Sequence, residues 1–184
     1  MIKTDRLRLR RWKDSDRQQF ARMNADPRVM QFFPRCLTRE ESDDLIEKIE
    51  RKIEERGFGL YAAELREDAS FIGFIGLSVP GFEAHFTPCV EIGWRLAAEY
   101  WNRGLATEGA RAAVHHAFDE LGIDALVSFT AEQNLPSRRV MEKIEMTRDP
   151  AEDFDHPGLP EGHALRRHVL YRIRGANFSL QQRL

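Results

Sequence analysis

The segment from Trp101 to Ala110 combines small residues with the start of a long helix, and that combination can bind an anion. Gly104 and Ala106 carry little or no side chain, so a ligand can approach the backbone N–H groups closely. A helix N-terminus adds unpaired N–H donors and the positive end of the helix dipole. The segment therefore indicates a diphosphate site, and the alternative is an ordinary strand-to-helix turn.

Two other phosphate-binding motifs are absent from the sequence. It contains neither G-x-G-x-x-G nor G-x-x-x-x-G-K-[ST]. Neither a dinucleotide-binding Rossmann site nor a P-loop is therefore supported.

Histidines and carboxylates also gather near the C-terminus, where a metal site is conceivable. Asp155 and His156 are followed by His163 and His168. Their spacing matches no standard zinc pattern, and the two cysteines of the chain add no ligand pair. We therefore predict no metal site.

Hydrophobic periodicity predicts the elements that position these residues. Leu7-Arg8-Leu9-Arg10 alternates like a half-buried strand, whose arginines we expect to face solvent. Thr38 and Glu41 have the spacing of a capping box, which starts a helix that ends at Gly57. The remaining pattern predicts an earlier helix after Asp14, strands at 60–65, 71–77, 90–96, 125–130 and 168–173, helices at 110–121 and 134–144, and a long loop at 147–165.

Composition restricts the class of protein. The 184 residues suit one compact domain, and 42% hydrophobic residues are too many for a disordered chain. The 28 basic residues do not exceed the 30 acidic ones, which argues against a dedicated nucleic-acid-binding protein. The sequence has no apolar run of membrane-spanning length and no signal-peptide pattern. A cytoplasmic protein with reduced cysteines is expected.

Three motifs in this element order resemble the GNAT superfamily of acyl-CoA-dependent N-acetyltransferases. They are Glu91-Ile92-Gly93-Trp94, the segment Tyr100 to Glu108, and Asn134-x-x-Ser137-x-x-x-Met141-Glu142-Lys143. More narrowly, the chain is similar to the ribosomal-protein N-terminal acetyltransferases (RimJ/RimL-like), from Leu7 to Ile173. The resemblance implies a single α/β (α+β) domain over residues 1–184, with a mixed, mostly antiparallel seven-strand sheet and about four helices. The acyl-CoA cleft would lie where strands 90–96 and 125–130 splay apart.

The resemblance also implies how acetyl-CoA, the co-substrate, would be held. The family's pyrophosphate loop falls on 101–106, where Trp101 replaces the usual Gln or Arg. Strand residues from Trp94 would pair their backbone with the pantetheine arm, and Asn134 would hydrogen-bond the cofactor. The expected cofactor-binding residues are Trp94, Arg95, Leu96, Trp101, Asn102, Arg103, Gly104, Leu105, Ala106, Thr107, Asn134 and Ser137.

Catalytic roles follow from the same resemblance and from two departures. Met141 stands where many members carry a Tyr that protonates the leaving thiolate, and a thioether cannot donate a proton. Ser137 is therefore the candidate general acid or thiolate stabiliser, and its alternative is a cofactor-contact or helix-capping serine. A general base, or a water chain ending in a carboxylate, must remove the amine proton. Glu91 is the candidate base, and its alternative is a buried or paired strand glutamate. A backbone N–H near Trp94 would stabilise the oxyanion. The second departure is Glu145-Met146 in place of Gly-Phe, which puts the local turn geometry in doubt.

The implied reaction is direct attack of a primary amine on the thioester within a ternary complex. A protein N-terminus is the first expected acceptor, while amino acids, polyamines and amino-sugar antibiotics remain open. Asp155 and His156 are candidate acceptor-site residues, or part of a plain polar loop. One alternative is a non-catalytic acyl-CoA-binding or regulatory module, and another is ribosome or RNA association without catalysis. Acetyl-CoA and the amine are the expected partners of a monomer or homodimer, without membrane or direct nucleic-acid binding.

Overall fold

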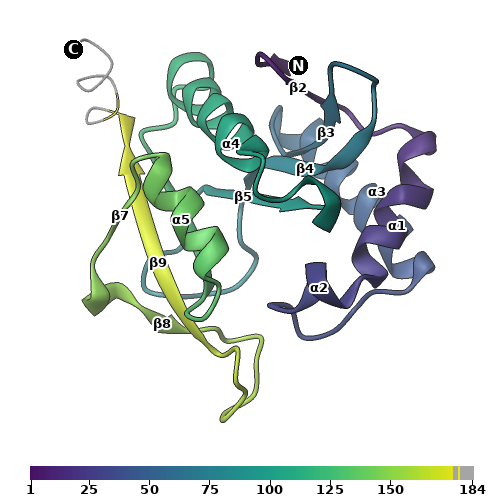
Figure 1. Ribbon diagram of the computed structural model, residues 1–184. Helices are drawn as coiled ribbons and strands as arrows, with labels where there is room; N and C mark the ends of the chain where they lie inside the picture. Colours follow the sequence, from purple (N-terminus) through teal and green to yellow (C-terminus); the bar gives the residue numbers. More distant parts are fainter. Residues whose placement is uncertain (176–177, 179–184) are drawn as a thin grey trace.

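The computed structural model describes residues 1–175 and 178. In this part of the chain, one sheet of nine strands has the order β1-β2-β3-β4-β5-β6-β9-β7, and β8 pairs with β9 (Figure 1). The family resemblance implies seven strands, and periodicity identifies six of the nine. The three that it misses, β1, β7 and β8, have two residues each, too few for a periodic pattern. The strands are β1 Ile2–Lys3, β2 Leu7–Arg10, β3 Leu60–Leu65, β4 Phe71–Ser78, β5 Glu91–Leu96, β6 Ala125–Ala131, β7 Thr147–Arg148, β8 Phe154–Asp155 and β9 Arg167–Arg174.

The sheet is divided between β5 and β6, which form the only parallel pair among the described strands. They share one register position, Glu91 opposite Val127, supported by a 2.9 Å hydrogen bond from the Val127 N–H to the Val90 carbonyl. The neighbouring β4–β5 and β6–β9 ladders, by contrast, run along most of their strands. The predicted mixed sheet with splayed central strands is therefore confirmed.

Five α-helices occur in the described residues, one more than predicted. The additional helix, α2, has only four residues, and its start is marked by Asp26, whose side chain accepts from the Arg28 N–H, with Pro27 at the first position. The capping box of Thr38 and Glu41 is present as predicted. The helices are α1 Arg17–Ala25, α2 Pro27–Met30, α3 Arg39–Arg56, α4 Leu105–His115 and α5 Leu135–Lys143.

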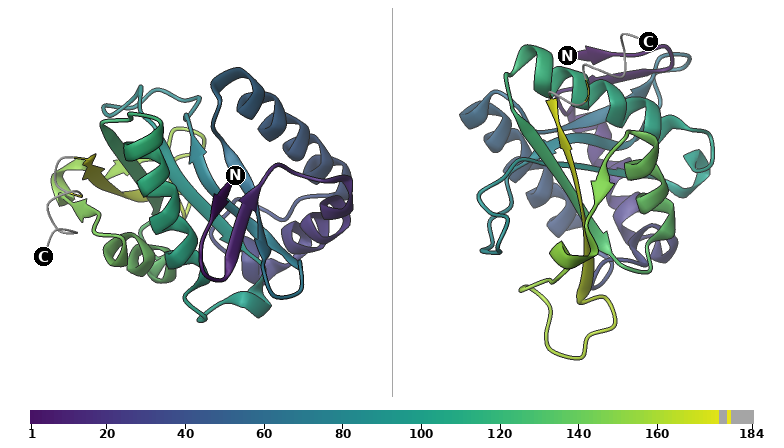
Figure 2. Two further views of the ribbon diagram at one scale, coloured as in Figure 1. Left: turned by 90° about the horizontal axis from the view of Figure 1, so that it is seen from above. Right: turned by 90° about the vertical axis from the view of Figure 1, so that its left-hand side faces the viewer.

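The helices α1 and α4 cover opposite faces of the sheet (Figures 1 and 2). Phe74 of β4 contacts Phe20 of α1, with ring centroids 6.1 Å apart. The next residue, Ile75, lies against Gly109 of α4, where an added Cβ would be 2.4 Å from the Ile75 side chain. Because consecutive strand residues point to opposite faces, the two helices must lie on opposite sides. Gly109 thus permits the close approach of α4.

The segment 147–165, predicted to be a loop, contains two short strands. Both β7 and β8 pair antiparallel with β9. Phe154 of β8 also joins a second, smaller hydrophobic cluster on the β6–β9 half of the sheet. The buried members of this cluster are Phe86, Val127, Phe154 and Leu170. Tertiary contacts therefore order part of a segment whose Pro and Gly content indicated a loop.

The expectation that the β2 arginines face solvent is wrong for Arg10. Its side chain is buried and donates from Nη1 and Nη2 to the two Asp16 carboxylate oxygens, at 2.7 and 2.9 Å. Its Nε donates to Glu64 Oε2 at 2.6 Å. Period-two alternation cannot distinguish a polar residue that faces water from one that is paired inside the protein.

Among the described residues, no helix has the length and apolar character needed to cross a membrane.

Candidate active site

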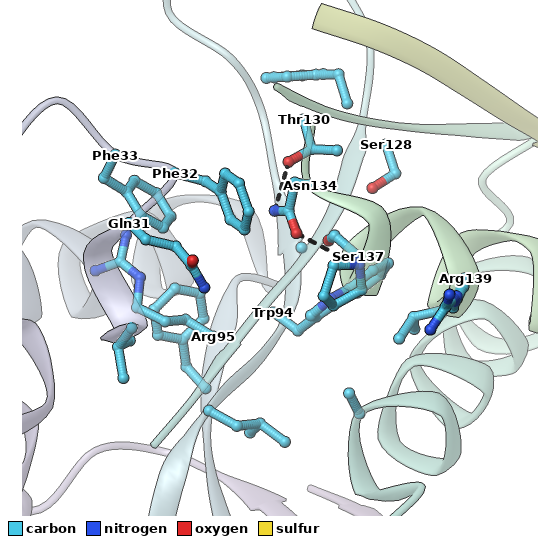
Figure 3. Close-up of a pocket in the computed structure, with 18 of the residues that line it drawn as sticks. Gln31, Phe32, Phe33, Trp94, Arg95, Ser128, Thr130, Asn134, Ser137 and Arg139 are labelled. Carbon is cyan, nitrogen blue, oxygen red and sulfur yellow. Dashed lines mark hydrogen bonds between the residues drawn. The ribbon is translucent and has the colours of Figure 1, made fainter. Parts of the chain in front are cut away.

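A cavity of about 710 Å³ opens where β5 and β6 diverge (Figure 3). Its walls come from β4, β5, β6, the start of α4, α5, the segment after α2 and the segment around His156. Within the described chain, its charged lining comprises one carboxylate, Glu91, and three cations, Arg95, Arg139 and Lys143. This excess of positive charge suits anionic groups on the ligands of the cavity.

The phosphate-loop candidate borders this cavity with free backbone donors. Asn102 and Gly104 both have left-handed backbone conformations, with φ of 58° and 76°. Gly104 is the N-cap of α4 and supplies no side-chain acceptor. The first N–H groups of a helix lack intrahelical partners, and Leu105, Ala106 and Thr107 line the cavity. These donors fit a diphosphate such as that of CoA.

An ion pair outside the predicted motifs holds this loop in place. Arg6 donates from Nη1 to the Arg103 carbonyl at 2.9 Å and from Nε to Glu108 Oε2 at 2.6 Å. The Thr4 hydroxyl donates to Glu108 Oε1 at 2.5 Å. The turn between β1 and β2 therefore clamps the start of α4. Sequence reasoning missed this clamp, because the residues lie about a hundred positions apart and no local pattern links them.

The β5 edge that faces the cleft offers backbone groups from alternate residues only. The Ala97 N–H bonds the Ile72 carbonyl, and alternation along the antiparallel ladder then directs the Arg95 backbone to β4. The Trp94 and Leu96 backbones point the other way, toward the cleft. The Leu96 carbonyl already accepts from Trp101 Nε1 at 2.8 Å. Of the three strand residues predicted to pair with pantetheine, Arg95 thus faces the cavity with its side chain instead.

The N-terminus of α5 presents Ser137 to the cavity. Asn134 is the N-cap: its Oδ1 accepts from the Ser137 N–H at 3.2 Å, and its Nδ2 donates to Thr130 Oγ1 at 2.8 Å (Figure 3). The capping group is therefore Asn134, whereas the Ser137 hydroxyl has no hydrogen-bond partner in the described structure. Met141 is buried in the hydrophobic core and does not line the cavity. Ser137 is thus the hydroxyl that α5 offers.

The turn after α5 explains the second departure noted in the sequence. Glu145 has φ of 68°, the left-handed conformation that favours glycine. The Met146 N–H bonds the Met141 carbonyl at 3.0 Å, which closes the helix in the usual way. The turn geometry is therefore retained without the glycine.

Glu91 lies at the apex of the cleft. Its Oε2 accepts from the Ser78 hydroxyl at 2.8 Å. Burial raises the pKa of this carboxyl to about 7, although the Ser78 hydrogen bond opposes the shift. A carboxylate with a pKa near neutrality, inside a cavity, has the properties of a general base.

Arg95 projects from β5 toward the segment after α2 (Figure 3). Its guanidinium lies 4.0 Å from the centroid of the Phe33 ring and donates to Asn24 Oδ1 at 2.7 Å. Burial lowers the pKa of Arg95 to about 10, so the side chain stays charged at neutral pH. Asn24 and Phe33 carry no sequence motif, and sequence reasoning missed both.

The two acceptor-site candidates separate in the structure. His156 lines the cavity and packs beside His168, with ring centroids 4.9 Å apart. Burial lowers the pKa of His168 to about 4. Asp155 does not line the cavity, and it faces Arg166 and Arg167 at 3.5 Å each. His156 directly follows β8 and its N–H still bonds the Arg166 carbonyl at 2.8 Å, so its side chain and that of Asp155 alternate as in a strand. No group of three metal-binding side chains exists among the described residues.

The cavity brings together most of the residues predicted from the sequence. Arg103 is outside its lining, and its guanidinium lies 5.7 Å from the Tyr100 ring centroid. The predicted residues that line the cavity are Glu91, Trp94, Arg95, Leu96, Trp101, Asn102, Gly104, Leu105, Ala106, Thr107, Asn134, Ser137 and His156.

Acyl transfer from a phosphate-bearing thioester requires a place for the phosphates, a strand edge for the amide-containing arm and a base for the nucleophile. Adjacent elements supply all three around one cleft, so the fold and the site define an acyltransferase. A family model described as an acetyltransferase (GNAT) domain matches residues 6–147. The chain belongs to the GNAT acetyltransferase family, as the sequence motifs indicated.

Individual relatives agree with this assignment. The uncharacterized N-acetyltransferase YnaD of Bacillus subtilis (strain 168) is 30% identical over 163 residues, which cover 88% of this chain and 89% of YnaD. FsC-acetyl coenzyme A-N(2)-transacetylase of Aspergillus fumigatus is 30% identical over 172 residues, covering 88% of this chain and 72% of the relative.

Solved structures share the fold. A GNAT-family acetyltransferase from Bacillus anthracis superposes with a TM-score of 0.78 and 26% identity, covering 95% of this chain and 98% of that one. The ribosomal L7/L12 α-N-protein acetyltransferase RimL, solved with coenzyme A, has a TM-score of 0.73 and 16% identity, covering 93% and 95% of the two chains. At that identity, the likeness to RimL concerns the fold alone.

Proposed function

We propose that this protein is an acetyl-CoA-dependent N-acetyltransferase that acts on a primary amine by direct attack within a ternary complex. The observation that carries the proposal is Glu91, a carboxylate with a pKa near 7 at the apex of the cleft. An amine is mostly protonated at neutral pH and must lose a proton before it can attack. Glu91 accepts that proton.

The remaining residues bind and position the two substrates. The α4 N-terminus, with Gly104, Leu105, Ala106 and Thr107, holds the diphosphate of acetyl-CoA, and Arg139 and Lys143 add positive charge to the same cavity. The free backbone of Trp94 on the cleft edge receives the pantetheine arm and donates to the developing oxyanion. The Ser137 hydroxyl stabilises the departing thiolate by donating a hydrogen bond to it, and the thiolate takes up the second proton that the amine nitrogen loses as the amide forms. Acetyl-CoA supplies the activated acyl group.

Two further parts of the proposal concern the cellular location of the protein and the identity of the acceptor. Cys36 and Cys89 are both free thiols, which is consistent with a cytoplasmic protein. His156, which lines the cavity, belongs to the acceptor side of the site, and Asp155 is retained only as a residue that positions the segment. A protein N-terminus is one member of the primary-amine class, so a short peptide with a free N-terminus belongs in any acceptor panel.

The test is a steady-state assay of thiol release from acetyl-CoA with a panel of primary amines, combined with mass spectrometry of the products. We expect an amine to gain one acetyl group, and Glu91→Gln to abolish most of the turnover. Calorimetric titration of acetyl-CoA into both proteins is the control, because Glu91→Gln should leave binding intact. Binding without turnover on any amine would contradict the proposal and favour the non-catalytic module.

A second candidate, the non-catalytic acyl-CoA-binding module, has one specific observation in its favour. Met141 is buried in the core, so the family's usual proton donor is missing from its position. The acetyl-transfer rates of the wild type and Ser137→Ala separate the two candidates. If the protein is an enzyme, the rate falls in the variant, whereas a binding module shows no acetyl transfer in either protein.

A further inference from the structure

Arg95 carries a positive charge that no carboxylate of the described chain neutralises. Its Nη1 donates to the amide oxygen of Asn24, a neutral group. Its Nε atom is buried and has no hydrogen-bond partner. No ion pair includes this residue in the part of the chain that the structure describes. The guanidinium nevertheless lines the cavity, beside Phe33 and Phe74.

Arg10 in the same protein shows how a buried arginine is usually accommodated. It has two carboxylate partners, Asp16 and Glu64, which contact all three of its nitrogens. Arg95 is half-buried, but its Nε is shielded from solvent, and a buried donor without a partner is unfavourable. The difference between Arg10 and Arg95 indicates that the partner of Arg95 is an anion from outside the chain.

Two buried polar side chains, Asn24 and Ser42, fix the orientation of this guanidinium through successive hydrogen bonds. Asn24 is fully buried, and its Nδ2 donates to Ser42 Oγ at 3.1 Å. The Ser42 hydroxyl in turn donates to the Thr38 carbonyl at 2.9 Å. Because Ser42 occupies the amide nitrogen, the Asn24 oxygen must face Arg95 and hold its Nη1. The edge formed by Nε and Nη2 is left free of protein acceptors among the described residues.

Glu91, Gly93 and Arg95 lie on the same face of β5. They are spaced by two residues, and their β4 partners Ser78, Gly76 and Phe74 occupy that face as well. Gly93 has no side chain, and an added Cβ there would have Glu91 Oε1, at 3.9 Å, as its only neighbour within 4 Å. The strand thus has a base at one end of this row, a cation at the other and open space between them.

We propose that Arg95 is a specificity-determining residue that binds a carboxylate on the acceptor amine, with the amine end held at Glu91 and the body of the acceptor over Gly93. This inference rests on the proposed N-acetyltransferase function. Two parallel N–H groups match a planar carboxylate in a bidentate pair. The Cα atoms of residues 91 and 95 are ~13 Å apart, at about 3.3 Å per strand residue. The acceptor class is therefore a primary amine whose carboxylate lies several bonds away.

Kinetics with matched acceptors test this directly. The acceptors 6-aminohexanoate and 6-aminohexanamide have similar shapes and differ in the charge of the far end. We expect wild-type kcat/KM to favour the carboxylate by roughly 100-fold, the effect of a charged bidentate pair. Arg95→Met should remove this preference, whereas Arg95→Lys, which keeps the charge but loses the two-pronged edge, should retain part of it. Acetyl-CoA affinity should be unchanged in both variants.

Asn24→Asp provides a variant that leaves Arg95 in place. The new carboxylate would neutralise the guanidinium from within the chain, so the preference for the charged acceptor should disappear although the arginine remains. Equal kcat/KM for the two acceptors in the wild type would overturn the inference while leaving the acetyltransferase function intact. A stronger response to an aminoalkyl phosphonate than to the carboxylate would overturn the choice of carboxylate.

A binding measurement separates this inference from the proposed function. In the presence of free CoA, 6-aminohexanoate should raise the Tm of the wild type but not of Arg95→Met, and 6-aminohexanamide should raise neither. That result supports the carboxylate site even if no acetyl transfer is detected. Absence of any Tm shift in the wild type, together with turnover on uncharged amines, would show that the inference is wrong and the function correct.

Discussion

Glu91 lies opposite Val127 at the one register position that joins β5 to β6 in the described sheet. The strands separate beyond this point, and the cavity begins there. The residue that closes the sheet is therefore also the residue with the raised pKa. The point where the two strands part thus carries a carboxylate whose pKa lies near neutrality.

The rate of acetyl transfer should depend on pH through Glu91. Burial raises the pKa of this carboxyl to about 7, so the basic form is gained as pH rises through that value. The wild-type kcat/KM should rise and then level off above pH ~7, once the contribution of the amine is subtracted. Glu91→Gln should lack this inflection and lose roughly 10²- to 10⁴-fold in rate.

Ser78→Ala serves as the matched variant for this assignment. The Ser78 hydroxyl stabilises the charged form of Glu91, so its removal should move the inflection to higher pH without abolishing activity. An inflection that persists in Glu91→Gln would assign the titration to a group other than Glu91.

Gly104 should be essential for acetyl-CoA binding because of its backbone conformation. Gly104→Val forces a β-branched residue into the left-handed region, at a cost of about 1–2 kcal/mol, and disturbs the donors at the start of α4. Calorimetry should show the Kd for acetyl-CoA at least about tenfold weaker.

Gly122 offers a control with the same kind of strain. It has φ of 64°, nothing within 4 Å of an added Cβ, and no place in the cavity lining. Gly122→Val should lose similar stability with an unchanged Kd. Equal weakening in both variants would mean that the effect is general and that the loop holds no phosphate.

Ser137 should contribute to turnover rather than to folding or binding. Its backbone N–H, not its hydroxyl, makes the capping bond to Asn134, so Ser137→Ala preserves the cap. We expect kcat to fall roughly 10- to 100-fold with the acetyl-CoA Kd unchanged. Asn134→Ala, by contrast, removes the cap and should lower stability by about 1 kcal/mol. A wild-type kcat in Ser137→Ala would exclude the hydroxyl from the mechanism.

Most of the predicted cofactor-binding residues line the cavity because local patterns carry them. Gly104 before a helix and Asn134 before another are signals that depend on neighbouring residues only. The surroundings of the Arg95 side chain depend on contacts across the fold: Asn24, Phe33 and Arg95 meet only after α1, α2 and β5 pack together. The sequence motifs predict a backbone role for Arg95. The β4–β5 register shows that its backbone pairs with β4 and that its side chain lines the cavity.

Short strands and paired charges limited the fold prediction in a similar way. The two-residue strands β7 and β8 exist because β9 offers them an edge, which no local pattern reports. The sequence pattern predicts a solvent-exposed Arg10. It cannot reveal the two carboxylates that pair with Arg10, because Asp16 lies six positions later and Glu64 lies 54 positions later in the sequence.

Glu145→Gly should stabilise the protein. Glu145 occupies the left-handed position after α5 with φ of 68°, where a residue with a Cβ costs about 1 kcal/mol relative to glycine. Because the hydrogen bond from Met146 N–H to the Met141 carbonyl already has the required geometry, glycine relieves strain without changing the turn. Thermal or urea unfolding should show a gain of about 0.5–1 kcal/mol, somewhat reduced by the greater freedom of glycine in the unfolded chain. Glu142→Gly, within α5, is the control and should lose more than the ~1 kcal/mol of helix propensity, because it also removes the hydrogen bond that Glu142 Oε1 accepts from the Tyr171 hydroxyl. Destabilisation by both glycines would show that Glu145 makes a favourable contact that outweighs its backbone strain.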